Sequence, residues 1–198
     1  MKKYAFDLDG TVTKIETLPL LANELGLAEE MKILTDLTLE GAIPFAKSFR
    51  LRYLVLRNIP IERIQEIMST VPFDEEIADF IREHKEDCAI VTGNLDRWIA
   101  PIIERLGCAS YTSKSEIAAD GTPVLTEILD KSAAIRHMRK CSDKVIAVGE
   151  SFNDVPMFEE ADLSVAYGGV HRPVDMAISV SDYVVFEGGA LCRLLKML

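Results

Sequence analysis

Two carboxylates separated by one residue, Asp7 and Asp9, follow an apolar segment near the start of the chain. Side chains alternate along a strand, so both carboxylates would share one face, and Gly10 lets the backbone turn as the strand ends. Open α/β folds bind their ligands at the carboxyl edge of a parallel sheet. At such an edge one carboxylate could attack an electrophile such as phosphorus, the other could move a proton, and both could hold a hard divalent cation. A simple polar turn would use the same residue types, so other sites in the sequence must decide between a turn and a catalytic site.

At three further sites the residue types suit phosphate chemistry. Thr92 and Gly93 follow the apolar run 88–91, where a hydroxyl and backbone N–H groups at the start of a helix suit a phosphate oxyanion. Lys131 opens a later helical segment, and a cation beside the carboxylates could neutralise both the phosphate and the nucleophile. Glu150 and Asp154 follow another apolar run, 145–148. Helix capping or a solvated lysine would explain each site alone, but four such strand ends in one order are hard to attribute to capping.

The segments that must position these residues alternate between two sequence patterns, one strand-like and one helical. Short apolar runs with polar or glycine boundaries predict buried parallel strands at 3–8, 88–92, 144–149, 162–166 and 182–186. Helical stretches lie between them at 95–106, 131–140, 153–160 and 189–197. This alternation predicts an α/β fold, a Rossmann-like parallel sheet with helices on both faces.

Residues 14–72 interrupt the alternation with four successive helix-like segments. Pro44 and Pro60 stand at expected first-turn positions, and Gly26 and Gly41 at expected stops. We expect a small helical cap domain here, inserted after the first strand, while 1–13 and 73–198 form the core. Within the core, Asp120-Gly121 between the extended segments of 113–130 predicts a hairpin or flap.

Length and composition limit the possible partners. The chain has 198 residues, 48% of them hydrophobic and 27% charged, which is ordinary for a globular domain with an inserted module. A net charge of −10 without a basic stripe argues against nucleic acid, so an anionic substrate must be captured by local cations and a metal ion. The chain begins directly with a strand and has no long apolar segment, which predicts a cytoplasmic protein without a membrane partner.

The cysteines and histidines carry no predicted role. The four cysteines are widely spaced without a CxxC pair, so free thiols are expected instead of a zinc site; they are Cys88, Cys108, Cys141 and Cys192. The three histidines are equally scattered, and no function is assigned to them; they are His84, His137 and His171.

In this order the motifs resemble those of the haloacid dehalogenase superfamily, and within it the phosphoserine phosphatases. The resemblance covers nearly the whole chain and rests on DxDGT at 7–11, Thr92-Gly93, Lys131, and Gly149-Glu150 to Asn153-Asp154. It implies a phosphomonoester hydrolase of the cytoplasm, with phosphoserine as the expected substrate and serine biosynthesis as the expected role. Monomer and homodimer are both compatible with it.

The resemblance also implies roles for individual residues. Asp7 is the expected nucleophile, which forms an aspartyl-phosphate, and Asp9 the expected acid and base. Mg²⁺ is expected on Asp7, the backbone carbonyl of Asp9 and Glu150, with Asp154 just behind them and Lys131 neutralising charge. Substrate binding is expected from two groups: Glu16, Phe45 and Arg52 in the cap, where Glu16 suits an amine and Arg52 a carboxylate, and Thr92, Gly93 and Asn153 in the core.

One departure from the family pattern affects the metal. The family usually has aspartate where this chain has Glu150, and the extra methylene changes how far the carboxylate reaches toward a cation that prefers near-ideal octahedral geometry. Metal affinity and rate are the properties that this change would alter.

Two other functions fit the same residues. The core could act on another small ester such as phosphoethanolamine, or transfer the phosphoryl group to an alcohol. Alternatively, the protein could be a phosphoacceptor switch or a phosphometabolite-binding protein without catalysis. Asp9 speaks against the last reading, because a signalling aspartate gains nothing from a general acid two residues downstream.

Overall fold

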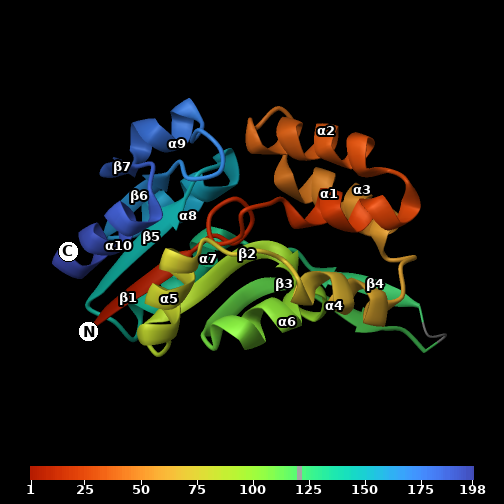
Figure 1. The fold of residues 1–198 in the computed structure, drawn as a ribbon, viewed down its shortest axis with the longest axis horizontal. Coiled ribbons are helices and arrows are strands. Elements are labelled where there is room, and N and C mark those ends of the chain that lie inside the picture. Colours follow the sequence, from red (N-terminus) through yellow and green to blue (C-terminus); the bar gives the residue numbers. More distant parts are fainter. Residues whose placement is uncertain (120–121) are drawn as a thin grey trace.

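The computed structural model describes residues 1–119 and 122–198, so the turn predicted at positions 120–121 lies outside the described residues. Seven strands form a sheet in the order β4-β3-β2-β1-β5-β6-β7 (Figure 1). Their bounds are β1 (Lys2–Phe6), β2 (Cys88–Leu95), β3 (Ala109–Ile117), β4 (Pro123–Glu127), β5 (Lys144–Gly149), β6 (Leu163–Tyr167) and β7 (Tyr183–Val185). All neighbouring strands are parallel except β3 and β4, which pair antiparallel.

The central strands are buried on both faces, which explains their nearly continuous apolar sequences. Along β1, Tyr4 and Phe6 belong to one hydrophobic cluster and Ala5 to another on the opposite face. All five predicted strands are present, and they correspond to β1, β2, β5, β6 and β7. The prediction of a mainly parallel α/β sheet is therefore confirmed.

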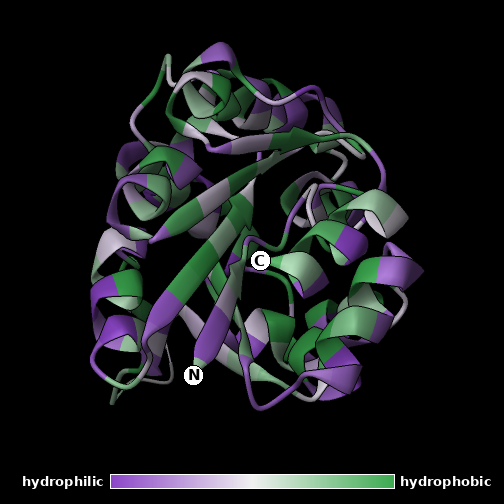
Figure 2. Cartoon of the chain, turned by 90° about the vertical axis from the view of Figure 1, so that its left-hand side faces the viewer, coloured by the Kyte–Doolittle hydropathy of each residue, from purple (hydrophilic) through white to green (hydrophobic). Residues whose placement is uncertain are grey.

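Helices cover both faces of this sheet. Those packed in the first cluster are α5 (Glu75–Glu83), α6 (Asp96–Leu106) and α10 (Gly188–Met197). Those packed in the second are α7 (Lys131–Arg139), α8 (Val155–Glu160) and α9 (Asp175–Val180). Figure 2 shows the largely hydrophobic strands between these two groups of helices. The four predicted core helices correspond to α6, α7, α10 and the pair formed by η2 (Phe152–Asp154) and α8.

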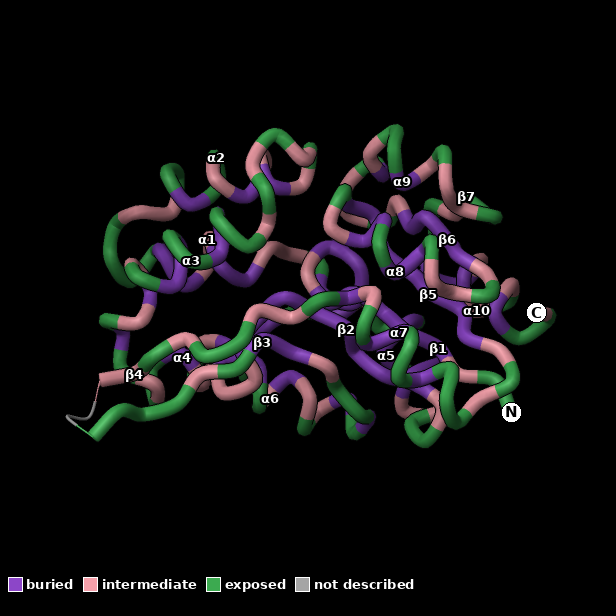
Figure 3. Tube along the Cα trace, turned by 180° about the vertical axis from the view of Figure 1, so that it is seen from behind, coloured by how far each residue is buried: buried purple, intermediate pink, exposed green. Residues whose placement is uncertain are grey.

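The segment between β1 and α5 forms the helical cap. Its elements are α1 (Thr17–Ala22), η1 (Asn23–Leu25), α2 (Ala28–Leu39), α3 (Phe45–Leu56) and α4 (Ile61–Ser69). Pro44 and Pro60 occupy the N-cap positions of α3 and α4, one residue before the predicted first turn. Figure 3 shows that buried, intermediate and exposed positions alternate along α2, as expected for a helix with one face packed on its neighbours. The inserted helical cap is thus confirmed.

The two segments by which the chain leaves and re-enters the core lie side by side. The N–H of Lys14 donates to the carbonyl of Pro72 at 3.0 Å, and the N–H of Asp74 donates to the carbonyl of Val12 at 2.9 Å. This pairing supports our proposal that 14–72 is a unit inserted into a core made of 1–13 and 73–198. Within the described residues, no helix combines the length and the apolar character that crossing a bilayer requires.

Candidate active site

Asp7 and Lys131 form a buried ion pair at the carboxyl end of the sheet. The backbone N–H of Asp7 donates to the carbonyl of Val148, which ties the end of β1 to β5. Lys131, the first residue of α7, has its Nζ 2.5 Å from Asp7 Oδ1 and 2.6 Å from Asp154 Oδ1. The two carboxylates raise the pKa of the Lys131 ammonium against the opposing effect of burial, so the cation stays charged. Three chain segments therefore meet around one buried lysine.

Asp154 organises the turn that follows β5. Its Oδ2 accepts hydrogen bonds of 2.9 Å from the backbone N–H groups of Glu150 and Ser151 and from the Ser151 hydroxyl. Its other oxygen binds Lys131, so both carboxylate oxygens are engaged. The side chain is fully buried. Asp154 consequently fixes the backbone that presents Glu150 to Asp7.

The Glu150 carboxylate has one satisfied and one orphaned oxygen. The Thr11 hydroxyl donates to Oε2, whereas Oε1 is buried and has no hydrogen-bond partner among the described residues. Gly10 makes room for it, because a Cβ at this position would lie 2.8 Å from Glu150 Oε1. Gly10 also has a φ of +77°, a conformation that glycine adopts without strain. An unpartnered buried carboxylate oxygen is costly unless a ligand binds it.

This acidic group fits a divalent cation. Asp7, Glu150 and Asp154 each offer one oxygen, and the three oxygens lie within 4.8 Å of one another. Burial, with the charge of Asp154, raises the pKa of Asp7 well above its usual value, although Lys131 opposes the shift. Burial and the charge of Asp7 do the same to the pKa of Glu150. Three buried carboxylates beside one ammonium leave excess negative charge, and hard divalent cations bind oxygen ligands of this kind.

Asp9 points away from this group, toward the cap. Its Oδ1 accepts hydrogen bonds from the backbone N–H of Thr17 at 2.8 Å and from the Thr17 hydroxyl at 2.5 Å. The Asn94 amide lies 3.4 Å from the other oxygen. Thr17 is the first residue of α1, so Asp9 both caps this helix and links the core to the cap.

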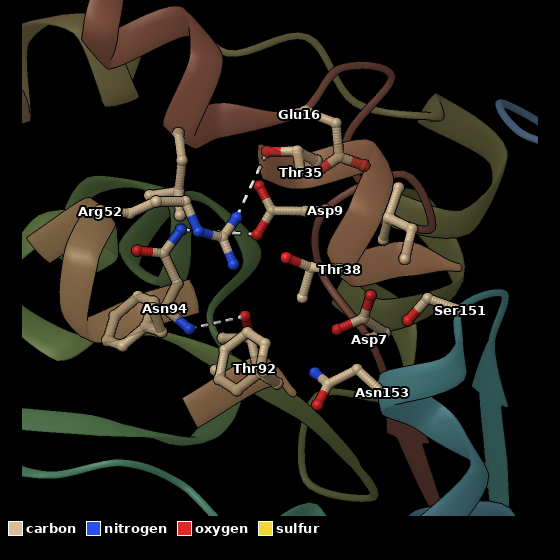
Figure 4. A pocket seen from close by; sticks show the side chains of 15 residues that line it. Asp7, Asp9, Glu16, Thr35, Thr38, Arg52, Thr92, Asn94, Ser151 and Asn153 are labelled. Atoms are coloured by element: carbon tan, nitrogen blue, oxygen red, sulfur yellow. Dashed lines mark hydrogen bonds between the residues drawn. The ribbon is translucent and has the colours of Figure 1, made fainter. Parts of the chain in front are cut away.

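A cavity of about 50 Å³ opens between the cap and the carboxyl edge of the sheet. Figure 4 shows the Arg52 side chain reaching it from the cap and Asp7, Asp9 and Asn153 bordering it from the core. Eight of the predicted site residues line it: Asp7, Asp9, Glu16, Phe45, Arg52, Thr92, Gly93 and Asn153. The other three predicted residues, Lys131, Glu150 and Asp154, contact or neighbour Asp7 without lining the cavity.

Gly93 permits the close approach of the cap to β2. A Cβ at this position would lie 2.0 Å from Cζ of Phe45, a distance that would force the ring away. Phe45 in turn stacks on Phe49, with ring centroids 5.4 Å apart. Glycine at position 93 therefore lets an aromatic side chain close one wall of the cavity.

Arg52 is a buried cation without a carboxylate partner. Its side chain donates to the Thr35 hydroxyl at 3.3 Å, its Nε has no hydrogen-bond partner, and the residue is 4% exposed. Among the described residues, none forms an ion pair with it. Burial lowers the pKa of the guanidinium to about 10, although Glu16 and Asp9 act in the opposite direction. A buried guanidinium that faces a cavity calls for an anion in that cavity.

Glu16 lies beside His171, a residue that the sequence analysis left without a role. Glu16 Oε1 and His171 Nε2 are 3.3 Å apart, although the two groups are not aligned for a hydrogen bond. Burial raises the pKa of Glu16. The Glu16 carboxylate in turn raises the pKa of His171, against the effect of partial burial. No local pattern could have identified this pair, because the two residues are distant in the sequence.

Other neighbours of the site had no role assigned from the sequence; those that contact predicted site residues include Thr11, Thr17, Thr35, Asn94 and Ser151. Thr11 and Ser151 lie within quoted motifs and Asn94 directly follows one, and this position was the available signal. Thr17 had no such signal, since its role depends on where α1 begins.

Comparisons with known proteins point to one family. The family model of haloacid dehalogenase-like hydrolases matches residues 4–159. The phosphoserine phosphatase of Methanocaldococcus jannaschii is 30% identical over 179 residues, which are 84% of this chain and 85% of that protein. A substrate-bound phosphoserine phosphatase structure superposes with a TM-score of 0.79 at 27% identity, covering 100% of this chain and 99% of that one. A phospho-aspartyl intermediate analogue of phosphoserine phosphatase has a TM-score of 0.78 at 24% identity, with both chains covered fully.

Proposed function

Because the chain belongs to the haloacid dehalogenase-like hydrolases, we propose that it hydrolyses O-phosphoserine to serine and phosphate. The single observation that carries this choice is the buried Arg52 guanidinium, which lacks a carboxylate partner and faces the same cavity as Asp7 and Asp9. A small phosphate ester that also bears a carboxylate would satisfy it. The curated relatives named as phosphoserine phosphatases support the same substrate. A cytoplasmic role in serine biosynthesis follows from this proposal.

Both ends of the amino acid have a complementary side chain in the cavity. The Arg52 fork can donate two parallel hydrogen bonds to a carboxylate, and Glu16 can attract an ammonium group. At the opposite end, the Thr92 hydroxyl, the Gly93 N–H and the Asn153 amide are proposed to bind the phosphate oxygens. Phe45 would exclude water above Gly93.

The proposed reaction has two displacements at phosphorus. Asp7 attacks the phosphorus, the bond to the serine oxygen breaks, and Asp9 gives its proton to the departing oxygen. Asp9 then takes a proton from water, which attacks the aspartyl-phosphate and releases inorganic phosphate, so that Asp7 is regenerated. Lys131 holds Asp7 in position and offsets negative charge throughout.

Asp7, Glu150 and the backbone carbonyl of Asp9 are proposed to hold Mg²⁺, with Asp154 behind them. When bound, the cation would offset the charge that develops on the phosphoryl oxygens. The orphaned Oε1 of Glu150 supports a metal at this position, because the longer glutamate side chain still leaves one buried oxygen without a partner. Thr11 would hold the other oxygen and thereby orient the carboxylate.

Phosphate release with Mg²⁺ from three related esters tests the proposal. O-Phosphoserine carries both an ammonium and a carboxylate, 3-phosphoglycerate keeps the carboxylate but replaces the ammonium by a hydroxyl, and phosphoethanolamine lacks the carboxylate. We expect the highest kcat/KM on O-phosphoserine. Equal efficiency on all three esters would leave a phosphatase that does not recognise an amino acid.

Arg52→Ala should lower kcat/KM on O-phosphoserine and on 3-phosphoglycerate. The lost transition-state stabilisation should be about 2 to 4 kcal/mol, the range for losing one partner of a desolvated charge pair. Activity on phosphoethanolamine should change far less. Arg50→Ala is the matched control, because Arg50 lies on the same helix but is exposed. Equal losses of Arg52→Ala on all three esters would indicate a structural role in the cap.

Glu16→Gln should show the complementary pattern, since it keeps the shape of the side chain and removes its charge. Efficiency should fall on O-phosphoserine and phosphoethanolamine, which carry an ammonium, and hold on 3-phosphoglycerate. Steady-state kinetics on the same three esters measure this difference. A uniform loss would contradict a role for Glu16 in binding the ammonium.

A further inference from the structure

A second, larger cavity lies at the junction of the cap and the core, and we call it the junction cavity. Its volume is about 260 Å³. Its walls come from the end of α3 and the start of α4 in the cap, and from α6, β3 and β4 in the core. Figure 1 shows α4 lying beside α6, near the antiparallel strands β3 and β4. It shares no lining residue with the cavity that contains Asp7.

Two arginines without partners border the junction cavity. Arg57 follows α3 and Arg97 lies in the first turn of α6. In residues 1–119 and 122–198, neither guanidinium takes part in an ion pair or a hydrogen bond. Five other arginines in the described part of the chain have a carboxylate partner, namely Arg63, Arg82, Arg136, Arg139 and Arg172. Arg50 and Arg193 also lack one there, but both are exposed, whereas Arg57 and Arg97 are half-buried. Two half-buried cations without a carboxylate partner therefore border this cavity, and among the described residues that line it there is no Asp or Glu.

A buried hydroxyl without a partner lines the same cavity. Tyr53 is 3% exposed, and its OH has no hydrogen-bond partner among the described residues. Its ring stacks on Trp98, with centroids 6.0 Å apart. Burial raises the pKa of Tyr53, whereas the charges of Arg57 and Arg97 act to lower it, so both cations act on this hydroxyl. A buried O–H is normally satisfied, and an acceptor inside the cavity would satisfy it.

The rest of the wall is largely apolar. It includes Ile59, Ile64, Trp98 and Ile117. Sites for small molecules commonly combine such a wall with a few converging polar groups that fix the orientation of the ligand. The polar lining residues are Arg57, Arg97, Tyr53, Asn58 and Ser115, and the Asn58 amide already donates to the carbonyls of Leu54 and Val55. The two cations and the Tyr53 hydroxyl therefore favour a ligand with an anionic head and an apolar body.

We propose that the junction cavity is a second ligand site, which binds a small organic carboxylate with an apolar body. The carboxylate accepts hydrogen bonds from Arg57, Arg97 and the Tyr53 hydroxyl, and the carbon chain lies against Trp98 and the isoleucines. The site is independent of the phosphatase reaction, because its walls contain none of the residues assigned to that reaction. Arg52 and Tyr53, neighbours on α3, contribute to the two different cavities.

The intrinsic tryptophan fluorescence of the chain can be used to measure ligand binding at this site. Trp98 is the single tryptophan of the sequence and lines the junction cavity. Titration of the wild type with hexanoate should give a saturable change in Trp98 emission. Hexanol, which lacks the charge, should bind at least about tenfold more weakly, and hexylamine should give no saturable change. The indole N–H resonance of Trp98 in a proton–nitrogen NMR spectrum should shift with the same midpoint.

Variants of the polar groups locate the carboxylate. Arg57→Gln and Arg97→Gln should each weaken hexanoate about tenfold, and Tyr53→Phe about fivefold, as expected for lost charged and neutral hydrogen bonds. Arg97→Lys keeps the charge and should retain part of the affinity, which separates binding from a folding defect. Arg50→Gln, an exposed position of α3 outside both cavities, should leave the affinity unchanged.

The Arg52→Ala variant decides between the two cavities. If hexanoate occupies the junction cavity, its midpoint should be unaffected by Arg52→Ala. A response that disappears in Arg52→Ala and persists in Arg57→Gln would assign the carboxylate to the active site and overturn the proposal. The proposal would also fail if hexylamine matched hexanoate, or if Arg57→Gln and Arg97→Gln both bound hexanoate like the wild type.

Discussion

The pairing of Lys131 with two carboxylates determines the state of Asp7. Burial and the charge of Asp154 favour the protonated acid, whereas Lys131 favours the carboxylate that a nucleophile requires. Lys131 is itself 4% exposed, so removing either carboxylate would weaken the compensation of a buried cation. Breaking a buried pair commonly costs about 3 to 5 kcal/mol, because the remaining charge stays desolvated. The residues proposed for catalysis therefore also contribute to the stability of this edge of the sheet.

Asp7→Asn should abolish turnover of O-phosphoserine, because a neutral amide is neither a nucleophile nor a good metal ligand. In the wild type, rapid acid quenching during turnover should trap a base-labile phosphate on Asp7, and peptide mapping should locate it. Asp175→Asn is the control, since the Asp175 side chain is 92% exposed and distant in sequence from Asp7. Phosphate mapped to any other residue would contradict the proposed nucleophile.

Sequence reasoning reached most of the cavity lining for a simple physical reason. Asp7, Thr92 and Glu150 lie at or just beyond the carboxyl ends of the buried parallel strands β1, β2 and β5, and these ends meet at one edge of the sheet, so the three residues had to lie near one another. The pairing of Glu16 with His171 could not be predicted in this way. It depends on how the cap packs against a loop of the core, and neither segment has a sequence periodicity that specifies their contact.

At the scale of elements, burial distinguishes the central strands, which were predicted, from β3, which was not predicted as a parallel strand. β1, β2 and β5 have buried runs, whereas β3 is partly exposed along its length and contains polar residues. Its sequence therefore lacked the apolar run expected of a parallel strand, and 113–130 was predicted as a hairpin or flap alone. β3 in fact pairs parallel with β2 and antiparallel with β4. α5 was also not predicted, although Asp74 caps its N-terminus.

The contact between Glu16 and His171 joins the beginning of the cap to the loop before α9. It should make the stability of the protein depend on pH with a defined sign. Glu16 raises the pKa of His171, so the folded state favours the protonated imidazole. The resulting stabilisation is fully present below the usual histidine pKa of about 6.5, and it is lost as the pH rises through the higher pKa of the folded state.

His171→Gln should therefore lower Tm more at about pH 6 than at about pH 9, as measured by thermal unfolding in matched buffers. The effect should be modest, because the His171 side chain is 41% exposed. In the Glu16→Gln background the same substitution should lose its pH dependence, since the charge that shifts the pKa is gone. A larger effect of His171→Gln at the higher pH would show that the sign is wrong.

At the scale of the whole molecule, one hydrophobic cluster extends from the sheet into the cap. Phe6 of β1, Phe49 of α3 and Ile64 of α4 belong to it. The cap is therefore packed onto the core, and the active-site cavity of about 50 Å³ is correspondingly narrow. We therefore expect the cap to move when a substrate enters, about the connection where Lys14 pairs with Pro72.

The excess negative charge beneath this cavity links metal binding to the stability of the whole chain. A ligand that binds the folded state alone stabilises it by about 2.7 kcal/mol at a concentration of 100 times Kd. For a protein of this length, each kcal/mol corresponds to roughly 2 to 4 °C in Tm. Saturating Mg²⁺ should thus raise Tm by about 5 to 10 °C relative to chelator at equal ionic strength.

Variants of Glu150 test whether the rise in Tm with Mg²⁺ comes from binding at the proposed site. Glu150→Ala removes the orphaned oxygen and one buried negative charge, so it should lose most of the Mg²⁺-dependent rise in Tm, even if the metal-free protein becomes more stable. Glu150→Asp keeps the carboxylate and should retain the rise together with the phosphatase activity. Glu159→Ala, an exposed acidic position on α8, should respond to Mg²⁺ like the wild type. An unchanged Mg²⁺ shift in Glu150→Ala would mean that the cation binds elsewhere, and that the buried carboxylates are compensated by Lys131 and protonation alone.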